Sequence, residues 1–250
     1  MIKKMKKMKK IKKINKFIFP AAFLLLCSPF ANAEWTNDHK FRLLSSQGSP
    51  KYKEQAGSQR TGLSTEQKTD FSGTRIGLGV PVKTFDLSLD FTDYKAKKSD
   101  FWAKKSELFV NVGYQLIPEK KWLQGVVTYY SVTNSFDKDH ASAPAAHVDA
   151  SNALGFGFSA GGMLKFSGHG LSSQIRYLYL TTLERSRNFG YDYFLDLGYS
   201  YIGEKFSLGI KIGQRIHRFN NTKSDETDPN LHYRVISNIE EQYIGLYLQL

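Results

Sequence analysis

Ten segments of the chain alternate apolar and polar residues with a period of two, which is the pattern of a β-strand whose two faces meet different surroundings. The segments are 39–45, 73–81, 84–94, 106–117, 122–133, 152–167, 170–184, 191–202, 205–217 and 239–250. No apolar run after residue 33 is long enough for a membrane-spanning helix. The alternation therefore predicts an all-β protein, either a soluble β-domain or a membrane barrel with one face of its sheet in lipid.

The gaps between the predicted strands alternate in length. The short gaps are Pro81 to Thr84, Pro118 to Lys121, Gly168-His169 and Gly203-Glu204. The long gaps are polar and comprise 46–72, 95–105, 134–151, 185–190 and 218–238. A membrane barrel with tight periplasmic turns and longer outer loops has this asymmetry.

The first 33 residues differ in composition from the rest. They carry nine lysines and no acidic residue, followed by an apolar run from Phe17 to Phe30 and the small-residue sequence Ala31-Asn32-Ala33. These are the parts of a secretory signal peptide, so we expect 1–33 to be removed and 34–250 to form the barrel domain. Removing the leader leaves 26 basic residues against 23 acidic ones, and this balance does not indicate a nucleic-acid partner.

The single cysteine, Cys27, lies inside this leader. It leaves a lipoprotein signal as an alternative, although Leu26 stands where such a signal needs a small residue. The domain that follows has no cysteine, so it can form no disulfide and depends on strand pairing and packing.

Tight turns would fix the cross-strand partners in three hairpins. With turns at Gly203-Glu204, around Val82-Lys83 and around Gly168-His169, each hairpin has one continuous apolar face. The predicted pairs include Ile202 with Lys205, Asp196 with Lys211, Asp192 with Arg215, Val80 with Phe85, Arg75 with Asp90, Phe166 with Leu171, and Gly161 with Arg176. Opposite charges therefore meet on the polar face.

That polar face is nearly neutral. It carries six basic and five acidic residues, namely Arg42, Arg75, Lys165, Arg176, Lys211 and Arg215 against Asp86, Asp90, Asp192, Asp196 and Glu241. Balanced charge suits an enclosed lumen, and we predict an antiparallel transmembrane β-barrel of about ten strands with its apolar face in lipid. The predicted lumen charge network consists of Arg75, Asp90, Arg176, Asp192, Asp196, Lys211, Arg215 and His217.

The final strand carries a family resemblance. Tyr243, Gly245, Leu248 and Leu250 fit the terminal assembly signal of outer-membrane barrels, although Leu replaces the usual final Phe. Together with the leader and the alternating gaps, the chain resembles a small outer-membrane β-barrel of Gram-negative bacteria. The resemblance implies a monomer in the cell outer membrane. Its implied partners are outer-membrane lipid, lipopolysaccharide and the barrel-assembly machinery.

Some outer-membrane barrels are enzymes. The omptin proteases also have ten strands, and Asp137, Asp139 and His140 supply fragments of their catalytic pairs, but within one loop. Lipid-A deacylases carry a His-x-Ser on a strand, whereas His140-Ala141-Ser142 lies in that same loop. We interpret His217, on the inward face near the outer mouth, as a hydrogen-bonding residue of the lumen.

We therefore expect no catalytic residues and no cofactor. His140, His147 and His232 lack the spacing of metal ligands, so we also expect no metal site. One outer loop is rich in lysine, with Lys95, Lys97, Lys98, Lys104 and Lys105, and these could either grip lipopolysaccharide phosphates or be solvated.

The predicted function is that of a non-enzymatic outer-membrane barrel whose polar outer loops interact with the envelope or with external partners. Three alternatives remain: a barrel enzyme acting on lipid or protein at the outer mouth, a narrow porin-like channel, and a soluble periplasmic β-barrel.

Overall fold

The computed structural model describes residues 35–36, 41–58, 65–97, 102–117, 122–136, 150–182, 189–224 and 232–250. The expected signal peptide, 1–33, lies outside the described residues and stays a prediction. In the part of the chain that the structure describes, no helix is long and apolar enough to cross a membrane.

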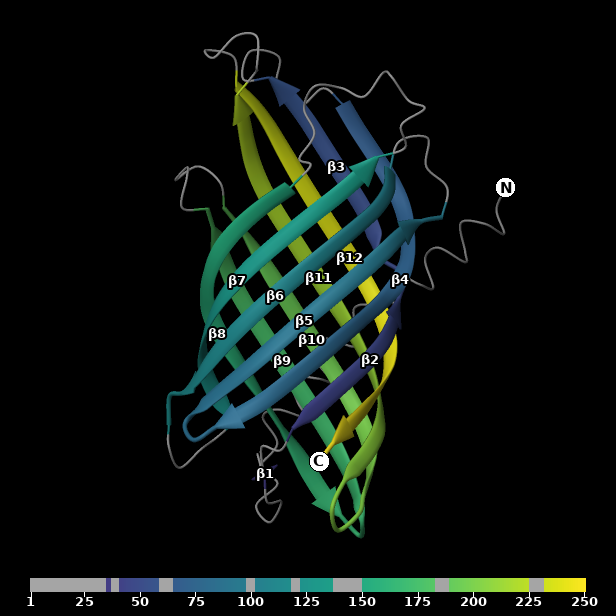
Figure 1. Cartoon of the computed structure of the whole chain (residues 1–250), viewed down its shortest axis with the longest axis vertical. Coiled ribbons are helices and arrows are strands. Elements are labelled where there is room, and N and C mark those ends of the chain that lie inside the picture. Colours follow the sequence, from purple (N-terminus) through teal and green to yellow (C-terminus); the bar gives the residue numbers. More distant parts are fainter. Residues whose placement is uncertain are drawn as a thin grey trace, which may run out of the picture. The chain divides into compact units, whose positions relative to one another are not determined.

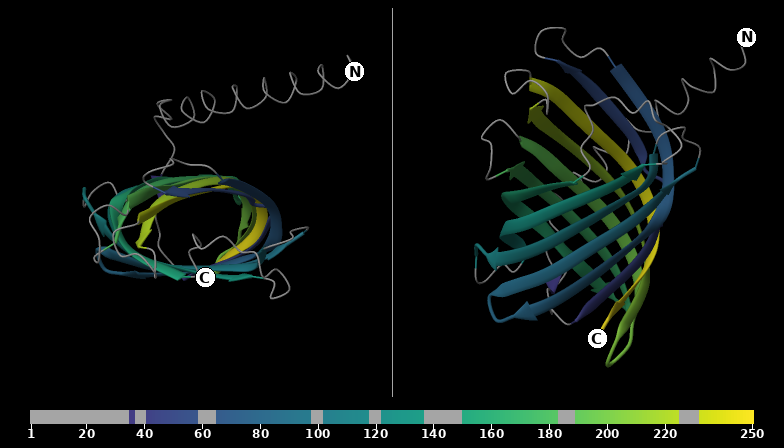
Figure 2. Two further views of the ribbon diagram at one scale, coloured as in Figure 1. Left: turned by 90° about the horizontal axis from the view of Figure 1, so that it is seen from above. Right: turned by 45° about the horizontal axis from the view of Figure 1, so that its top comes forward.

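The described residues form one antiparallel β-sheet that closes into a barrel (Figure 1). Its strands are β1 (Trp35–Thr36), β2 (Arg42–Gly48), β3 (Lys51–Ser58), β4 (Thr65–Val82), β5 (Phe85–Ala96), β6 (Trp102–Gln115), β7 (Leu123–Phe136), β8 (Ala150–Phe166), β9 (His169–Thr181), β10 (Phe189–Ile202), β11 (Ser207–Ser224) and β12 (His232–Gln249). From β4 to β12 each strand pairs with the next one along the chain. Seen from above, the strands form a closed ring (Figure 2).

The barrel has ten strand positions, because β2 and β3 lie end to end in one of them. Both pair with β12 on one side and with β4 on the other, and β12 thereby closes the barrel. The break between them falls at Ser49-Pro50, where proline has no N–H to donate to the sheet. The short strand β1 pairs with Met163 and Leu164 of β8, beyond the last β7 partner of β8. The prediction of an all-β antiparallel barrel of about ten strands is confirmed.

All three predicted hairpin registers are wrong by two residues. Val82 pairs with Phe85 and Phe166 with His169, so both turns contain two residues. Lys83 and Ser167 adopt left-handed conformations in these turns, with φ of 56° and 45°. At β10–β11 a longer turn forms, closed by a 2.8 Å hydrogen bond from Gly203 N to Phe206 O. Because each shift is even, no side chain changes face.

The strands also extend further at the loop end than the alternation predicts. All of β3, the start of β4 and the end of β11 occupy sequence that the polar composition assigns to loops. Outward side chains are polar there, so the alternation stops while the backbone pairing continues. The strands β3, β4, β11 and β12 consequently rise above β7 and β8 at the loop end (Figure 1).

The polarity of the barrel is the reverse of that of a soluble protein. Large apolar side chains face outward around the wall, and Val127, Phe156 and Leu246 are each about 60% exposed. Inward-facing Asp192 and Arg215 are instead 0% and 1% exposed. A belt of exposed apolar side chains around buried charges is stable only with lipid outside, so the chain is a transmembrane β-barrel.

Candidate functional site

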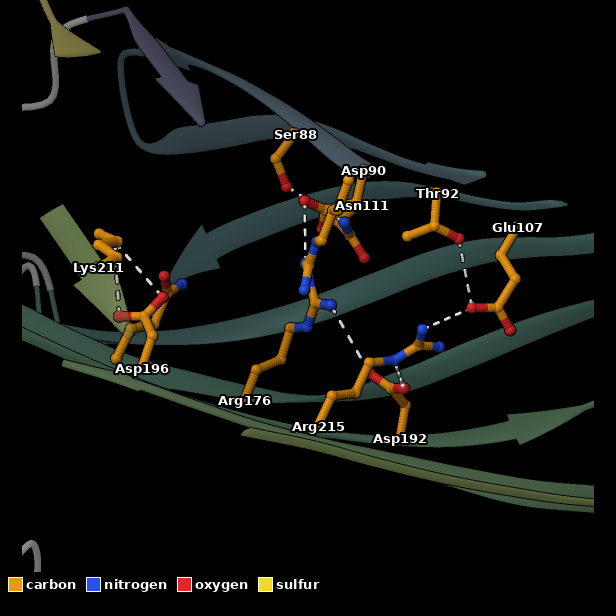
Figure 3. Close-up of polar contacts among 12 residues, drawn as sticks. Ser88, Asp90, Thr92, Glu107, Asn111, Arg176, Asp192, Asp196, Lys211 and Arg215 are labelled. Atoms are coloured by element: carbon orange, nitrogen blue, oxygen red, sulfur yellow. Dashed lines mark hydrogen bonds and ion pairs between the residues drawn. The ribbon is translucent and has the colours of Figure 1, made fainter. Parts of the chain in front are cut away.

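A buried arginine joins opposite walls of the lumen. Arg215 of β11 donates from Nε to Asp192 Oδ1 of β10 at 2.6 Å and from Nη1 to Glu107 Oε2 of β6 at 2.5 Å (Figure 3). All three side chains are at most 1% exposed. Charge-assisted bonds of this kind in a dry interior hold β6 and β11 together across the lumen.

A second arginine extends the network toward the turn end. Arg176 of β9 donates from Nη1 to Asp90 Oδ2 of β5 at 3.1 Å, and its Nη2 lies 3.6 Å from Asp192 Oδ2. Arg75 Nη2 of β4 lies 3.1 Å from the other oxygen of Asp90. Both guanidinium groups also lie near the ring of Phe194, with central carbons 4.4 Å (Arg75) and 5.3 Å (Arg176) from its centroid. Such cation–π contacts compensate part of the cost of burying the two cations.

The ion pair between Lys211 and Asp196 is longer and more exposed than the other predicted ion pairs. Lys211 Nζ lies 3.4 Å from both carboxylate oxygens of Asp196, and the lysine side chain is 17% exposed. This ammonium also lies 5.1 Å from the centroid of the Tyr247 ring. It lines a cavity at the turn end of the lumen, whereas Arg215 does not.

The structure thus brings the eight predicted lumen residues into the lumen, but not as the directly opposite pairs that were predicted. Asp196 stands opposite Gly213 and Asp192 opposite His217. The ion pairs run diagonally instead, because long side chains on one face reach partners two residues away.

Glu107 and Lys105 are network residues that the sequence reasoning missed. Lys105 was predicted in an outer loop, and this prediction is wrong, because its side chain is inward and 4% exposed. Its Nζ lies 3.8 Å from Glu107 Oε1 and donates to Asn134 Oδ1 at 3.3 Å. Alternation along the strand could have revealed both residues. They are an even number of positions from Gly113, which lines the lumen, so they lie on the same inward face.

His217 lies inside this network without access to solvent. Its Nδ1 is 3.3 Å from Asp192 Oδ1, its ring centroid is 5.0 Å from that of Tyr130, and the residue is 1% exposed. It contacts the Asp192 carboxylate and is buried from solvent.

The loop candidates Asp137, Asp139, His140, Ser142 and His147 lie outside the described residues. Within the described ranges no group of three or more His, Cys, Asp or Glu side chains is placed to hold a metal ion.

Aromatic and aliphatic side chains fill the lumen on the loop side of the network. One buried cluster comprises Phe109, Val126, Tyr130, Val132, Ala153, Leu178, Leu180 and Phe219. A second comprises Tyr52, Phe71, Tyr94 and Ile239. Two phenols bind network carboxylates at 2.8 Å, Tyr130 to Glu107 and Tyr94 to Glu241. Apolar packing and charge pairing therefore fill this part of the lumen together.

The turn end of the lumen is hollow. A cavity of about 440 Å³ extends from Arg75 and Arg176 down to Gly203 and Glu204 of the β10–β11 turn. Exposed Glu204 stands at its rim, so this cavity reaches the turn end of the barrel.

The residues of the predicted assembly signal lie at the seam that closes the barrel. Tyr243 faces inward and stacks on Phe194 with ring centroids 5.6 Å apart. A Cβ at Gly245 would come within 2.5 Å of Ser46 Cβ in the adjoining strand. Leu248 pairs with strands on both sides, and Leu250 N donates to the Phe41 carbonyl at 3.0 Å.

No protein-family model matches the chain, and no curated protein matches its sequence. Solved structures of similar shape include Neisserial surface protein A, with 14% identity, a TM-score of 0.34 and coverage of 84% of this chain and 97% of that one. An outer membrane channel from Pseudomonas putida F1 has 10% identity, a TM-score of 0.34 and coverage of 86% and 98%. The translocator domain of the autotransporter NalP from Neisseria meningitidis has 12% identity, a TM-score of 0.32 and coverage of 85% and 90%.

Values this low single out no one of these proteins as a functional relative. The closed ten-stranded barrel, its apolar belt and its buried charges are themselves the features of an outer-membrane barrel. The chain is a transmembrane β-barrel of the outer-membrane type.

Proposed function

We propose that the protein is a non-conducting, non-enzymatic barrel that presents its polar loop-end surface to the envelope or to external partners. The observation that carries this proposal is the closed layer across the lumen, where Arg215, Glu107, Asp192, Tyr130 and Leu178 are each at most 1% exposed.

The layer resists opening for two physical reasons. An ion crossing it would have to separate buried ion pairs, and leaving one such charge without its partner costs roughly 3–5 kcal/mol. Beyond the pairs, Leu178, Leu180 and Phe219 offer an ion no polar group to replace its water. We therefore expect no steady ion flow through the resting barrel.

The narrow channel is the second candidate, and the hollow turn end favours it. The cavity of about 440 Å³ already admits water to the level of Arg176. Conduction would require only that the Arg215 layer and the apolar clusters above it move aside. The enzyme alternative has less support among the described residues, because His217 is buried beneath aromatic rings.

The monomeric state, the assembly machinery and the lipid partners predicted from the sequence are part of the same proposal. An apolar belt around the wall suits a monomer surrounded by lipid, and the seam residues of β12 are where the barrel-assembly machinery would act. Outer-membrane lipid and lipopolysaccharide would then be the immediate neighbours of the loop-end surface.

Two measurements test the proposal. The native protein should migrate anomalously on unheated denaturing gels, as closed barrels do, and should give no steady current in planar bilayers. The double variant Arg215→Ser with Glu107→Ser should show more frequent brief openings, because it removes the ion-pair part of the barrier, but no steady current, because the apolar clusters above it remain. The matched control, Lys211→Ser with Asp196→Ser, alters a pair in the existing cavity and should stay silent. Large steady currents through the unaltered protein would refute the proposal and establish the channel.

A further inference from the structure

Lysines dominate one part of the outer wall just above the apolar belt. The outermost apolar row is formed by the cross-strand partners Ile76, Phe91 and Leu108 of β4, β5 and β6. Beyond it, the outward side chains of β3 to β6 form what we term the lysine wall. Its members are Lys51, Lys53, Lys68, Lys95, Lys97 and Lys104. The acidic residues among them are Glu66, Asp70 and Asp93.

Two pairs in the lysine wall place like charges directly opposite each other. Lys53 faces Lys68 across β3 and β4, and Lys95 faces Lys104 across β5 and β6. Directly opposed like charges destabilise a sheet. Glu66 already bridges the Lys53–Lys68 pair, but no anion among the described residues bridges Lys95 and Lys104. An anion placed between the two ammonium groups of a pair would reverse the sign of the interaction.

The acidic side chains neutralise the lysine wall only in part. Glu66 accepts from Lys68 at 2.6 Å and from Lys53 at 2.9 Å, and these two ammonium groups lower the pKa of its carboxyl to about 2. Asp93 lies 3.0 Å from Lys104. Lys95 makes no ion pair with any residue that the structure describes, and six cations face three anions.

The Lys95–Lys104 pair stands within reach of the lipid headgroups, whereas the Lys53–Lys68 pair, eight residues along β4 from Ile76, lies about 20 Å above the belt. The Lys95–Lys104 pair lies four residues along its strands from the Phe91–Leu108 pair, which is about 13 Å along the strand or, at the tilt of such barrels, about 10 Å in height. The headgroup layer of a bilayer leaflet is roughly 5–8 Å deep, and lysine stems bend back toward it.

We infer that the Lys95–Lys104 pair of the lysine wall binds the phosphate groups of lipids in the leaflet around the loop end of the barrel. This inference rests on the proposed function and names the partner of its polar surface. The two opposed ammonium groups supply the charge, their exposure admits the ligand, and their position above the belt selects a membrane lipid. In the outer membrane a phosphorylated lipid of this leaflet is lipid A, the lipid portion of lipopolysaccharide.

The experiment compares stability in vesicles of phosphatidylcholine alone and of phosphatidylcholine containing lipid A. The test variant, Lys95→Gln with Lys104→Gln, removes both lysines of the opposed pair that lies nearest the lipid. The control variant, Lys83→Gln with Lys205→Gln, removes the same charge from exposed turns at the other end of the barrel. Anomalous migration on unheated gels first shows that each variant is folded.

Lipid A should raise the urea midpoint of the unaltered protein and of the control variant. The test variant should lose most of that increase, and its affinity for lipid A should fall about twenty-five-fold, from about fivefold for each lysine. In phosphatidylcholine alone its urea midpoint should stay close to that of the unaltered protein, because the loss of the exposed Lys104–Asp93 ion pair offsets the removed like-charge repulsion. No stabilisation of the unaltered protein by lipid A, or equal stabilisation of both variants, would overturn the inference. A folded, non-conducting barrel with that result would leave the proposed function standing.

Discussion

The two ion pairs on β10 and β11 should differ in coupling energy, because one is dry and the other is not. Arg215 and Asp192 are 1% and 0% exposed and 2.6 Å apart, whereas Lys211 is 17% exposed and 3.4 Å from Asp196. We propose two double-mutant cycles with near-isosteric variants. One combines Asp192→Asn with Arg215→Gln, and the other combines Asp196→Asn with Lys211→Gln.

We estimate the stability cost of each substitution from the burial of the pair and from the partners that the remaining charge keeps. Removing one member of a fully buried pair typically costs about 3–5 kcal/mol. Arg215 would keep Glu107 at 2.5 Å, so we expect the low end, about 3 kcal/mol, for Asp192→Asn. Lys211 borders the cavity, and loss of Asp196 should cost only about 1 kcal/mol. In each cycle the double variant should recover part of the loss, since the unpaired charge is removed as well.

The assay is equilibrium unfolding in urea, with each variant refolded into the same phosphatidylcholine vesicles. Unchanged slopes against urea would show that the unfolded states are comparable. The coupling energy of each cycle is then the departure of the double variant from additivity. Equal couplings in the two cycles, or a larger one for Asp196 and Lys211, would refute the argument that burial in the central layer sets the strength of the network.

Three further perturbations test the seam, the packing and a turn. Deleting Tyr247–Leu250 should abolish the heat-modifiable form in membrane fractions, because β12 would leave unpaired backbone groups at the seam, and normal levels would contradict this. Gly157→Ala should lower the free energy of unfolding in urea by about 1–3 kcal/mol, because its Cβ would lie 1.9 Å from the Tyr177 carbonyl oxygen. Gly203→Ala is the milder control, because its Cβ would lie 3.2 Å from the nearest atom, the Phe206 carbonyl oxygen. Ser167→Asn should raise the midpoint slightly, because asparagine tolerates a φ of 45° better than serine, and a lowered midpoint would count against the turn.

Within the predicted strands, the sequence alone was enough to predict which way the side chains face. Alternation assigns a face by parity, and parity survives any shift of register by an even number of residues. Asp192, Asp196, Lys211 and Arg215 were therefore predicted inward although every hairpin partner was wrong. The same rule extended one residue before the predicted start at residue 106 would have found Lys105 inside the barrel, and it already assigns Glu107 to the inward face.

The alternation of apolar and polar residues could not predict how far the strands extend at the loop end. Above the lipid, outward side chains are polar like the inward ones, so β3 and the first part of β4 carry no period-two signal. Their pairing comes from backbone hydrogen bonds that continue from the membrane-spanning part. Sequence reasoning consequently placed the lysine wall in loops and could not see its opposed pairs.

Register and the network across the lumen were decided only by the tertiary structure. Lys83 and Ser167 adopt left-handed conformations that neither residue type signals, and those turns move each hairpin by two residues. The contact between Glu107 on β6 and Arg215 on β11 depends on the number and tilt of the strands, because these set which residues meet at one height across the lumen. Alternation along a strand carries no information about that height, so the closed layer emerges only when the barrel closes.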